Sequence, residues 1–104
     1  MTQEFALLHI PSRMQELGHG TNYFTPTPQH YSLQAGEVRS IDAYNAYFFL
    51  TSADADISVR SEFGMYDLNN PLLNQQLYEH EGKIIITNTS RNLRHVQFIQ
   101  VIIK

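Results

Sequence analysis

The sequence lacks cysteine and is poor in charge. None of its 104 residues is a cysteine, which excludes disulfide frameworks, zinc–thiolate sites and thiol nucleophiles. Charged residues make up 16% of the chain, whereas about a quarter is usual. The surface must therefore be covered largely by Gln, Asn, Ser and Thr. Polar but uncharged surfaces are common where a protein meets copies of itself or another partner.

Basic residues are too few and too scattered to indicate nucleic-acid binding. The formal net charge is −3 and only two lysines are present, Lys83 and Lys104. Nucleic-acid-binding proteins usually carry a basic stripe that displaces counterions from phosphates. The one basic group is Arg91, Arg94 and His95, and its place beside an Asn/Ser turn is typical of a solvated hairpin tip. We therefore expect no nucleic-acid partner.

Long apolar runs are missing as well. No run approaches the length needed to cross a bilayer, so no membrane partner is expected. The first 14 residues lack a basic region followed by a sustained apolar stretch, and so do not read as a signal peptide. Asn88-Thr89-Ser90 matches a glycosylation acceptor, but without a secretion signal we interpret it as turn chemistry.

The composition indicates one folded domain over residues 1–104. A chain of 12.0 kDa fits a single domain. Its 42% hydrophobic and 12% aromatic residues allow enough apolar burial to offset the entropy of ordering the chain.

Alternation of apolar and polar residues predicts several short β-strands. Ile57 and Val59 alternate with polar neighbours, as in a strand with one face in the core. The aromatic run from Tyr47 to Leu50 predicts a strand buried on both faces or one at a sheet corner. Predicted strands cover residues 38–41, 45–52, 57–60, 65–68, 84–86 and 96–103.

The last predicted strand changes its pattern halfway. Residues 84–86 and 96–103 read as strand, turn and strand, with the turn at residues 88–92. Val96 and Phe98 share one parity, whereas Ile99 and Val101 share the other. A β-bulge would flip the faces in this way. A strand covered on both sides gives the same pattern, and both interpretations stay open.

Helical signals are thin and the predicted class is all-β. We expect one helical turn over residues 12–17 after Pro11, and a loop or a turn or two of helix after Asn70-Pro71. Pro26 and Pro28 remove backbone donors, so residues 18–34 should form an edge strand or a loop. Short strands at about ten-residue spacing predict a β-sandwich or jelly-roll-like barrel of antiparallel strands.

No metal-ligand spacing is visible among the histidines. None of the five belongs to an H-x-H or H-x-x-x-H pair, and the two-histidine and glutamate motif of cupin enzymes is missing. We interpret them as ordinary loop or surface residues: His9, His19, His30, His80 and His95.

No motif with the residue spacing of a known calcium-binding or catalytic site is visible either. Asp54 and Asp56 lack the glycine and distal glutamate of a calcium loop, and a turn is the better interpretation. No G-x-S-x-G elbow exists. Glu62 with Glu79 or Glu81 could form a glycosidase pair only if the fold assembles them. The sequence therefore assigns no catalytic, cofactor-binding or metal-binding residue and predicts no cofactor.

Aromatic residues remain as candidates for a ligand or interface site. Tyr23, Phe24 and Tyr31 lie in a segment rich in Thr and Pro, where less core is available to cover them. Exposed aromatic rings stack on sugars or anchor protein interfaces.

Residues 55–104 carry a series of motifs: Val59-Arg60, then Gly64 and the apolar residues of 65–68, an apolar strand at 84–86, Asn88-Thr89-Ser90 and a final strand beginning at Val96. In this series the chain resembles small β-sandwich proteins encoded among phage structural genes. The resemblance implies a virion subunit (a capsid-decoration, head-fibre or tail-associated piece) located in the virion or the infected cell's cytoplasm.

We therefore expect a non-enzymatic structural subunit that forms a homo-oligomer and contacts other virion proteins. Two alternatives stay open. One is a small carbohydrate-binding module that uses Tyr23, Phe24 and Tyr31. The other is a cupin-like enzyme whose site comes together only in the fold.

Overall fold

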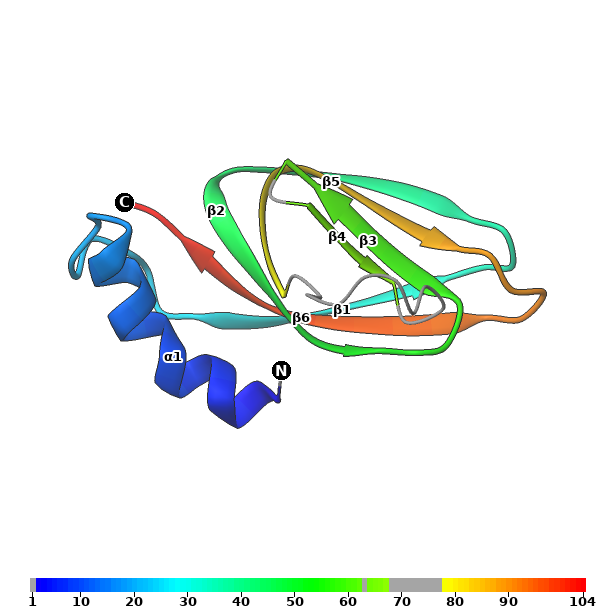
Figure 1. Ribbon diagram of the computed structural model, residues 1–104, viewed down its shortest axis with the longest axis horizontal. Helices are drawn as coiled ribbons and strands as arrows, with labels where there is room; N and C mark the ends of the chain where they lie inside the picture. The colour runs from blue at the N-terminus through cyan, green and yellow to red at the C-terminus, as the bar shows by residue number, and fades with distance from the viewer. Residues whose placement is uncertain (1, 63, 68–77) are drawn as a thin grey trace.

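The computed structural model describes residues 2–62, 64–67 and 78–104. One helix precedes six strands along the chain (Figure 1). Their bounds are α1 Gln3–Glu16, β1 Thr27–Leu33, β2 Val38–Ala53, β3 Ile57–Ser61, β4 Gly64–Asp67, β5 Glu79–Asn88 and β6 Arg94–Ile102. The helical turn or loop predicted after Asn70-Pro71 lies outside the described residues, as does the end of the strand predicted at 65–68.

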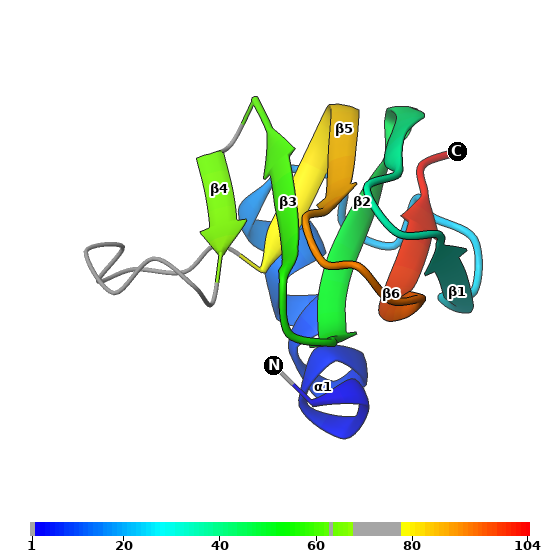
Figure 2. The ribbon, with the colours of Figure 1, turned by 90° about the vertical axis from the view of Figure 1, so that its right-hand side faces the viewer.

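The six strands form one antiparallel sheet, which confirms the all-β prediction. Their order is β1-β6-β2-β5-β3-β4, and Figure 2 shows it from β4 on the left to β1 on the right. Every paired neighbour is antiparallel. The described strands make one continuous sheet that bends over its own core, so the two layers of the expected sandwich are two halves of a single sheet.

The bend is built into β2, which belongs to both halves. Residues 38–43 pair with β5 alone, residues 47–49 pair with β5 on one side and β6 on the other, and the end of the strand pairs with β6. In Figure 1, β2 runs along the top, turns at the left and returns along the bottom. The register with β5 jumps between Ala43 and Tyr47. Asn45 has a φ of 61° and Gly82, opposite Ala43, a φ of 72°, so both strands change direction at the same level.

The bent sheet encloses an inner core to which every strand contributes. The apolar residues of alternate positions point into it because successive side chains of a strand point to opposite faces. We call inner core the buried residues Leu33, Ala43, Ala46, Phe48, Leu50, Ile57, Val59, Tyr66, Ile84, Ile86, Val96 and Phe98.

A second, smaller core lies between α1 and the outer face of β2 and β6. Its buried residues are Ala6, Ile10, Met14, Tyr47, Phe49, Ile99 and Val101. The helix is capped by Thr2, whose hydroxyl accepts a hydrogen bond from the Phe5 N–H at 3.1 Å. The prediction of a single turn at 12–17 was therefore wrong: the helix has 14 residues and passes through Pro11.

The two cores settle both predictions about strand faces. Tyr47 and Phe49 face the helix while Phe48 and Leu50 face the inner core, so this strand is buried on both faces. In β6 the change of parity has the same cause, because Ile99 and Val101 lie under α1. An irregularity does occur nearby, but in the partner strand, between Leu50 and Ser52 of β2.

The connection between β5 and β6 is not a hairpin. β2 lies between these two strands in the sheet, and residues 89–93 carry the chain from the start of β2, where Val38 is opposite Thr87, to its end, where Ala53 is opposite Val96. The sequence predicted strand, turn and strand correctly, but not that another strand separates them. β1 is an edge strand, as Pro28 predicted, since Pro28 lies within it and only β6 pairs with it in the described part of the chain.

Candidate functional site

α1 exposes three large apolar side chains to solvent. The helix buries Ala6, Ile10 and Met14, one residue every four, against the sheet. Phe5, Leu7 and Leu8 nevertheless lie on its solvent side, with exposed fractions of 56%, 44% and 80%. We call these three residues the outer face of α1. Large apolar side chains gathered on an exposed element mark interaction sites, so this face is the strongest candidate for an interaction surface.

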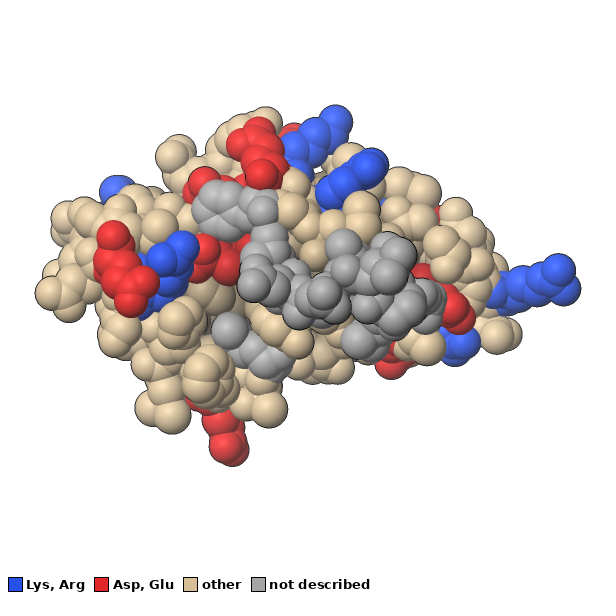
Figure 3. Space-filling view, viewed as in Figure 1, with Lys and Arg blue, Asp and Glu red and all other residues tan. Residues whose placement is uncertain are grey.

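Few charges interrupt this surface. The helix carries only Glu4, Arg13 and Glu16 as charged residues. In Figure 3 the surface over α1, at the lower left, is mostly uncharged, and its red and blue side chains lie towards its margins.

A hollow of about 400 Å³ adjoins the same helix. Its lining residues come from α1 and from the loop that follows it: Pro11, Gln15, Gly20, Thr21 and Tyr23. The hollow offers a place for a side chain of a molecule that binds over α1.

The three aromatic candidates do not form one surface. Tyr23 is partly buried against the helix-side core and pairs with Ile103. Phe24 is 53% exposed, and Lys104 Nζ lies 5.2 Å from the centre of its ring. Both residues therefore adjoin the C-terminal end of β6.

Tyr31 lies elsewhere and faces the opposite side of the sheet. It pairs with Val96, near the start of β6. Its ring packs on the inner core, edge-on to Phe98 at 6.0 Å, and the Arg39 guanidinium lies 6.0 Å from it. Burial raises the pKa of the Tyr31 phenol. A single sugar-binding platform made of all three aromatic residues is therefore not assembled.

Polar contacts fix the C-terminal half of α1 to the sheet. Arg13 donates two hydrogen bonds to the Glu79 carboxylate, at 2.7 and 2.8 Å, and these bonds raise the pKa of Arg13. The Tyr47 hydroxyl lies 3.0 Å from His19 Nε2. Burial, and after it the charge of Glu81, raises the pKa of Tyr47. These contacts hold the helix in the orientation that presents its apolar side outward.

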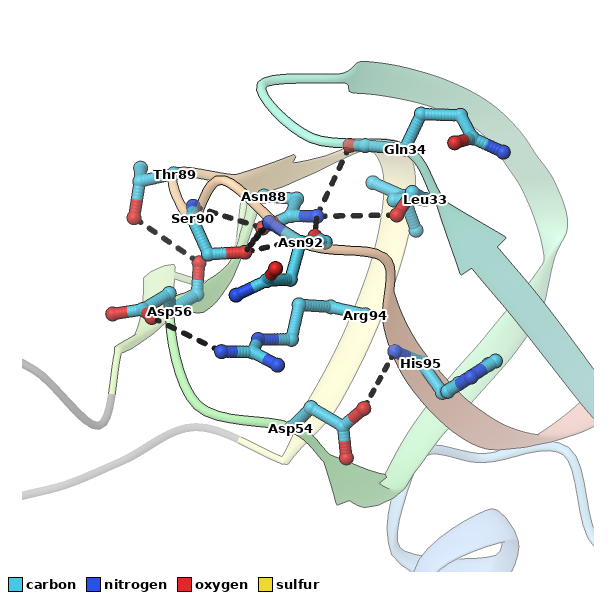
Figure 4. A network of polar contacts seen from close by, with 10 residues as sticks. All are labelled: Leu33, Gln34, Asp54, Asp56, Asn88, Thr89, Ser90, Asn92, Arg94 and His95. Carbon is cyan, nitrogen blue, oxygen red and sulfur yellow. Dashed lines mark hydrogen bonds and ion pairs between the residues drawn. The ribbon is translucent and has the colours of Figure 1, made fainter.

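A second polar network organises the far end of the sheet (Figure 4). Asn88 is fully buried. Its side-chain amide donates to the carbonyls of Leu33, Gln34 and Asn92 at 3.1, 3.0 and 2.8 Å. Its oxygen accepts from the backbone N–H and the hydroxyl of Ser90 at 2.9 and 2.7 Å. The interpretation of Asn88-Thr89-Ser90 as turn chemistry is confirmed.

The basic group beside this turn is only partly solvated. Arg91 and His95 are exposed, but Arg94 folds inward. Its Nε is buried without a hydrogen-bond partner, and its Nη2 lies 3.8 Å from Asp56 Oδ2. Asp54 accepts a hydrogen bond from the His95 N–H at 2.8 Å. Asp54 and Asp56 thus stabilise a turn, as predicted, and the hairpin-tip interpretation was wrong for Arg94.

The remaining sequence candidates have structural contacts. His80 is fully buried, and its Nδ1 lies 2.7 Å from Ser61 Oγ. The expectation of an ordinary loop or surface histidine was therefore wrong at this position. Of the carboxylates considered for glycoside hydrolysis, Glu79 is paired with Arg13. The carboxyl group of Glu62 lies against Gly82.

One contact between histidines was not foreseen. His30 Nε2 and His95 Nδ1 lie 3.1 Å apart across β1 and β6. Only the sheet register could reveal this pair, since 65 residues separate the two in the chain. Larger groups, of three or more His, Cys, Asp or Glu side chains placed to hold a metal ion, do not occur within residues 2–62, 64–67 and 78–104.

In the described part of the chain, no helix combines the length and apolar character needed to cross a membrane. Comparisons with protein-family models, curated proteins and solved structures found no match to this chain.

Proposed function

We propose that this chain is a non-enzymatic structural subunit that associates with copies of itself through the outer face of α1. The observation that carries this proposal is the exposure of Phe5, Leu7 and Leu8 on one helix that is already anchored to the sheet by its opposite side. Burying such side chains against a partner is favourable, because each Å² of apolar surface removed from water contributes about 25 cal/mol of free energy.

A second copy of the chain is the occupant that fits this face best. In a two-fold contact the same patch meets itself, so a charged patch would face its own charge. Phe5, Leu7 and Leu8 carry no charge and can meet their own copies, while Glu4, on the same turn of the helix, must lie outside the contact. The hollow between Pro11 and Tyr23 lies beside the face and can receive a side chain from the facing helix.

The setting in a phage particle rests on the resemblance of residues 55–104 alone. The low charge content supports an assembly role, because charged groups are depleted at interface cores. The carbohydrate-binding alternative gains no support from the placement of its three aromatic residues, since Tyr31 packs on the inner core and lies apart from the other two.

The test is the solution mass, measured by size-exclusion chromatography with multi-angle light scattering over a range of concentrations. We expect the unmodified chain to form a closed oligomer that survives dilution. Leu8→Glu places a charge at the most exposed apolar position of the helix and should shift the mass towards that of one chain.

Leu93→Glu is the matched control. Leu93 is 46% exposed but lies in the β5–β6 connection, so the same chemical change should leave the oligomer intact. A single-chain mass for the unmodified protein at every concentration would overturn the proposal. An oligomer that Leu93→Glu dissociates and Leu8→Glu does not would overturn the choice of surface.

A further inference from the structure

Two histidines on the solvent side of the sheet are placed like the ligands of a metal ion. His30 Nε2 and His95 Nδ1 lie 3.1 Å apart, and both residues are exposed. Their ring centres are 5.1 Å apart, with the ring planes tilted by 47°. Because both side chains lie outside the two cores, packing does not account for their approach.

The register of β1 against β6 produces the pair. Ser32 lies directly opposite His95, and His30 lies opposite Gln97. Residues two apart share a face of a strand, so His30 and His95 are diagonal neighbours on the same side. Ser32 Oγ lies 3.0 Å from His95 Nδ1, which keeps this nitrogen turned towards β1.

Two imidazole nitrogens this close share either a proton or a cation. Nitrogen ligands lie about 2.0–2.1 Å from Zn²⁺, and two such ligands 3.1 Å apart subtend roughly 98° at the ion. That angle falls between the values of about 90° and about 109° that octahedral and tetrahedral sites require. We infer that His30 and His95 jointly bind a divalent transition-metal ion such as Zn²⁺ at the β1–β6 edge.

The surroundings leave room for the remaining ligands. A hollow of about 170 Å³ adjoins the pair, and its lining includes His30, Thr51 and Gln97, whose hydroxyl and amide groups are polar. The Asp54 carboxylate is held by the backbone N–H of His95 (Figure 4). It contributes negative charge near the pair and is not itself a ligand. Two protein ligands leave the site open, with water in the other positions.

Imidazole selects the class of ion. It suits zinc, copper and nickel, whereas calcium and magnesium require oxygen ligands. Both nitrogens must be unprotonated to bind, so His30 carries its proton on Nδ1 and His95 on Nε2 in the bound form. The pair lies on β1 and β6 and includes none of Phe5, Leu7 and Leu8, so the inference does not depend on the proposed function.

Calorimetric titration of the full chain with Zn²⁺, after treatment with a chelator and its removal, tests the inference. We expect one ion per chain and a loss of affinity of about tenfold or more in both His30→Ala and His95→Ala, since even residues that only support a metal ligand contribute about 10–100-fold. His9→Gln removes a histidine of α1 instead and should leave the affinity unchanged. Near-ultraviolet circular dichroism of each variant verifies that the fold is retained.

Nitrogen chemical shifts of the histidine rings give an independent measurement. Saturation with Zn²⁺ should change the shifts of His30 Nε2 and His95 Nδ1 together. Absence of binding would mean that the two rings share only a proton and would overturn the inference. Binding that survives both alanine substitutions, or shifts that change at other histidines instead, would overturn it as well.

Discussion

At the scale of single residues, the side chain of Asn88 connects three separate segments of the chain by hydrogen bonds. One buried side chain contacts the end of β1, the turn before β2 and the β5–β6 connection. An amide has two N–H donors, so the three accepting carbonyls share them. Removing this side chain would leave carbonyl groups in a buried place without their donor.

Asn88→Ala should therefore lower the free energy of unfolding by about 2–4 kcal/mol, since each lost bond contributes about 1 kcal/mol and buried orphan groups add to the cost. Urea denaturation followed by fluorescence measures the change. Asn92→Ala is the control because only the backbone of Asn92 takes part in this network, and it should change the stability by less than about 0.5 kcal/mol. Equal effects of the two substitutions would contradict this role for the Asn88 amide.

Individual residues also show where sequence reasoning stops. The turn chemistry of Asn88 was predictable from its neighbours, but its contact with Leu33 depends on how distant strands are arranged. The pairing of His30 with His95 depends in the same way on the register. The burial of His80 was within reach, because it shares the parity of the inward-facing Ile84 and Ile86.

At the scale of elements, α1 is the part of the fold that the sequence concealed. The buried residues Ala6, Ile10 and Met14 do follow a helical spacing. Exposed Leu7 and Leu8 blur that stripe, and Pro11 suggests a break because proline lacks the N–H that a helix interior uses. The strands were easier to predict, since the alternation along 57–60 and the apolar residues of 38–41 and 45–52 can be recognised without a distant partner.

Pro11→Ala should stabilise the protein by about 1–3 kcal/mol. Pro11 lies inside the helix and is exposed, so alanine restores a backbone donor for the Leu7 carbonyl and removes a ring that clashes with the preceding turn. Thermal unfolding and far-ultraviolet circular dichroism measure stability and helix content together. A lower midpoint of thermal unfolding in Pro11→Ala would contradict this expectation. It would show that contacts of the proline ring stabilise the protein more than the restored hydrogen bond does.

At the scale of the whole molecule, three tyrosines make stability depend on alkaline pH. Burial is the largest cause of a raised pKa in Tyr31, Tyr47 and Tyr66, above the ordinary value of 10.0. The folded state therefore favours the neutral phenol more than the unfolded state does. The stability that the folded state gains from these neutral phenols is complete below pH 10.0. It is lost as the pH rises through the raised pKa values.

We expect the urea midpoint to fall as the pH rises above about 10, where unfolded phenols ionise. Tyr66→Phe removes one of the ionising groups, so its midpoint should fall less over the same interval. A midpoint that stays constant for the unmodified chain, or a slope that Tyr66→Phe leaves unchanged, would contradict this assignment.

The position of β6 between β1 and β2 has a consequence for synthesis on the ribosome. The chain is made from its N-terminus, yet β1 has no strand partner in the described sheet, and one edge of the second half of β2 stays open, until residues 94–102 have emerged. The surface on which α1 packs also needs Ile99 and Val101. The nascent chain must therefore keep an unpaired β1, an open edge of β2 and an undocked helix from wrong partners until β6 is available, whereas β3 and β4 can pair as soon as both are made.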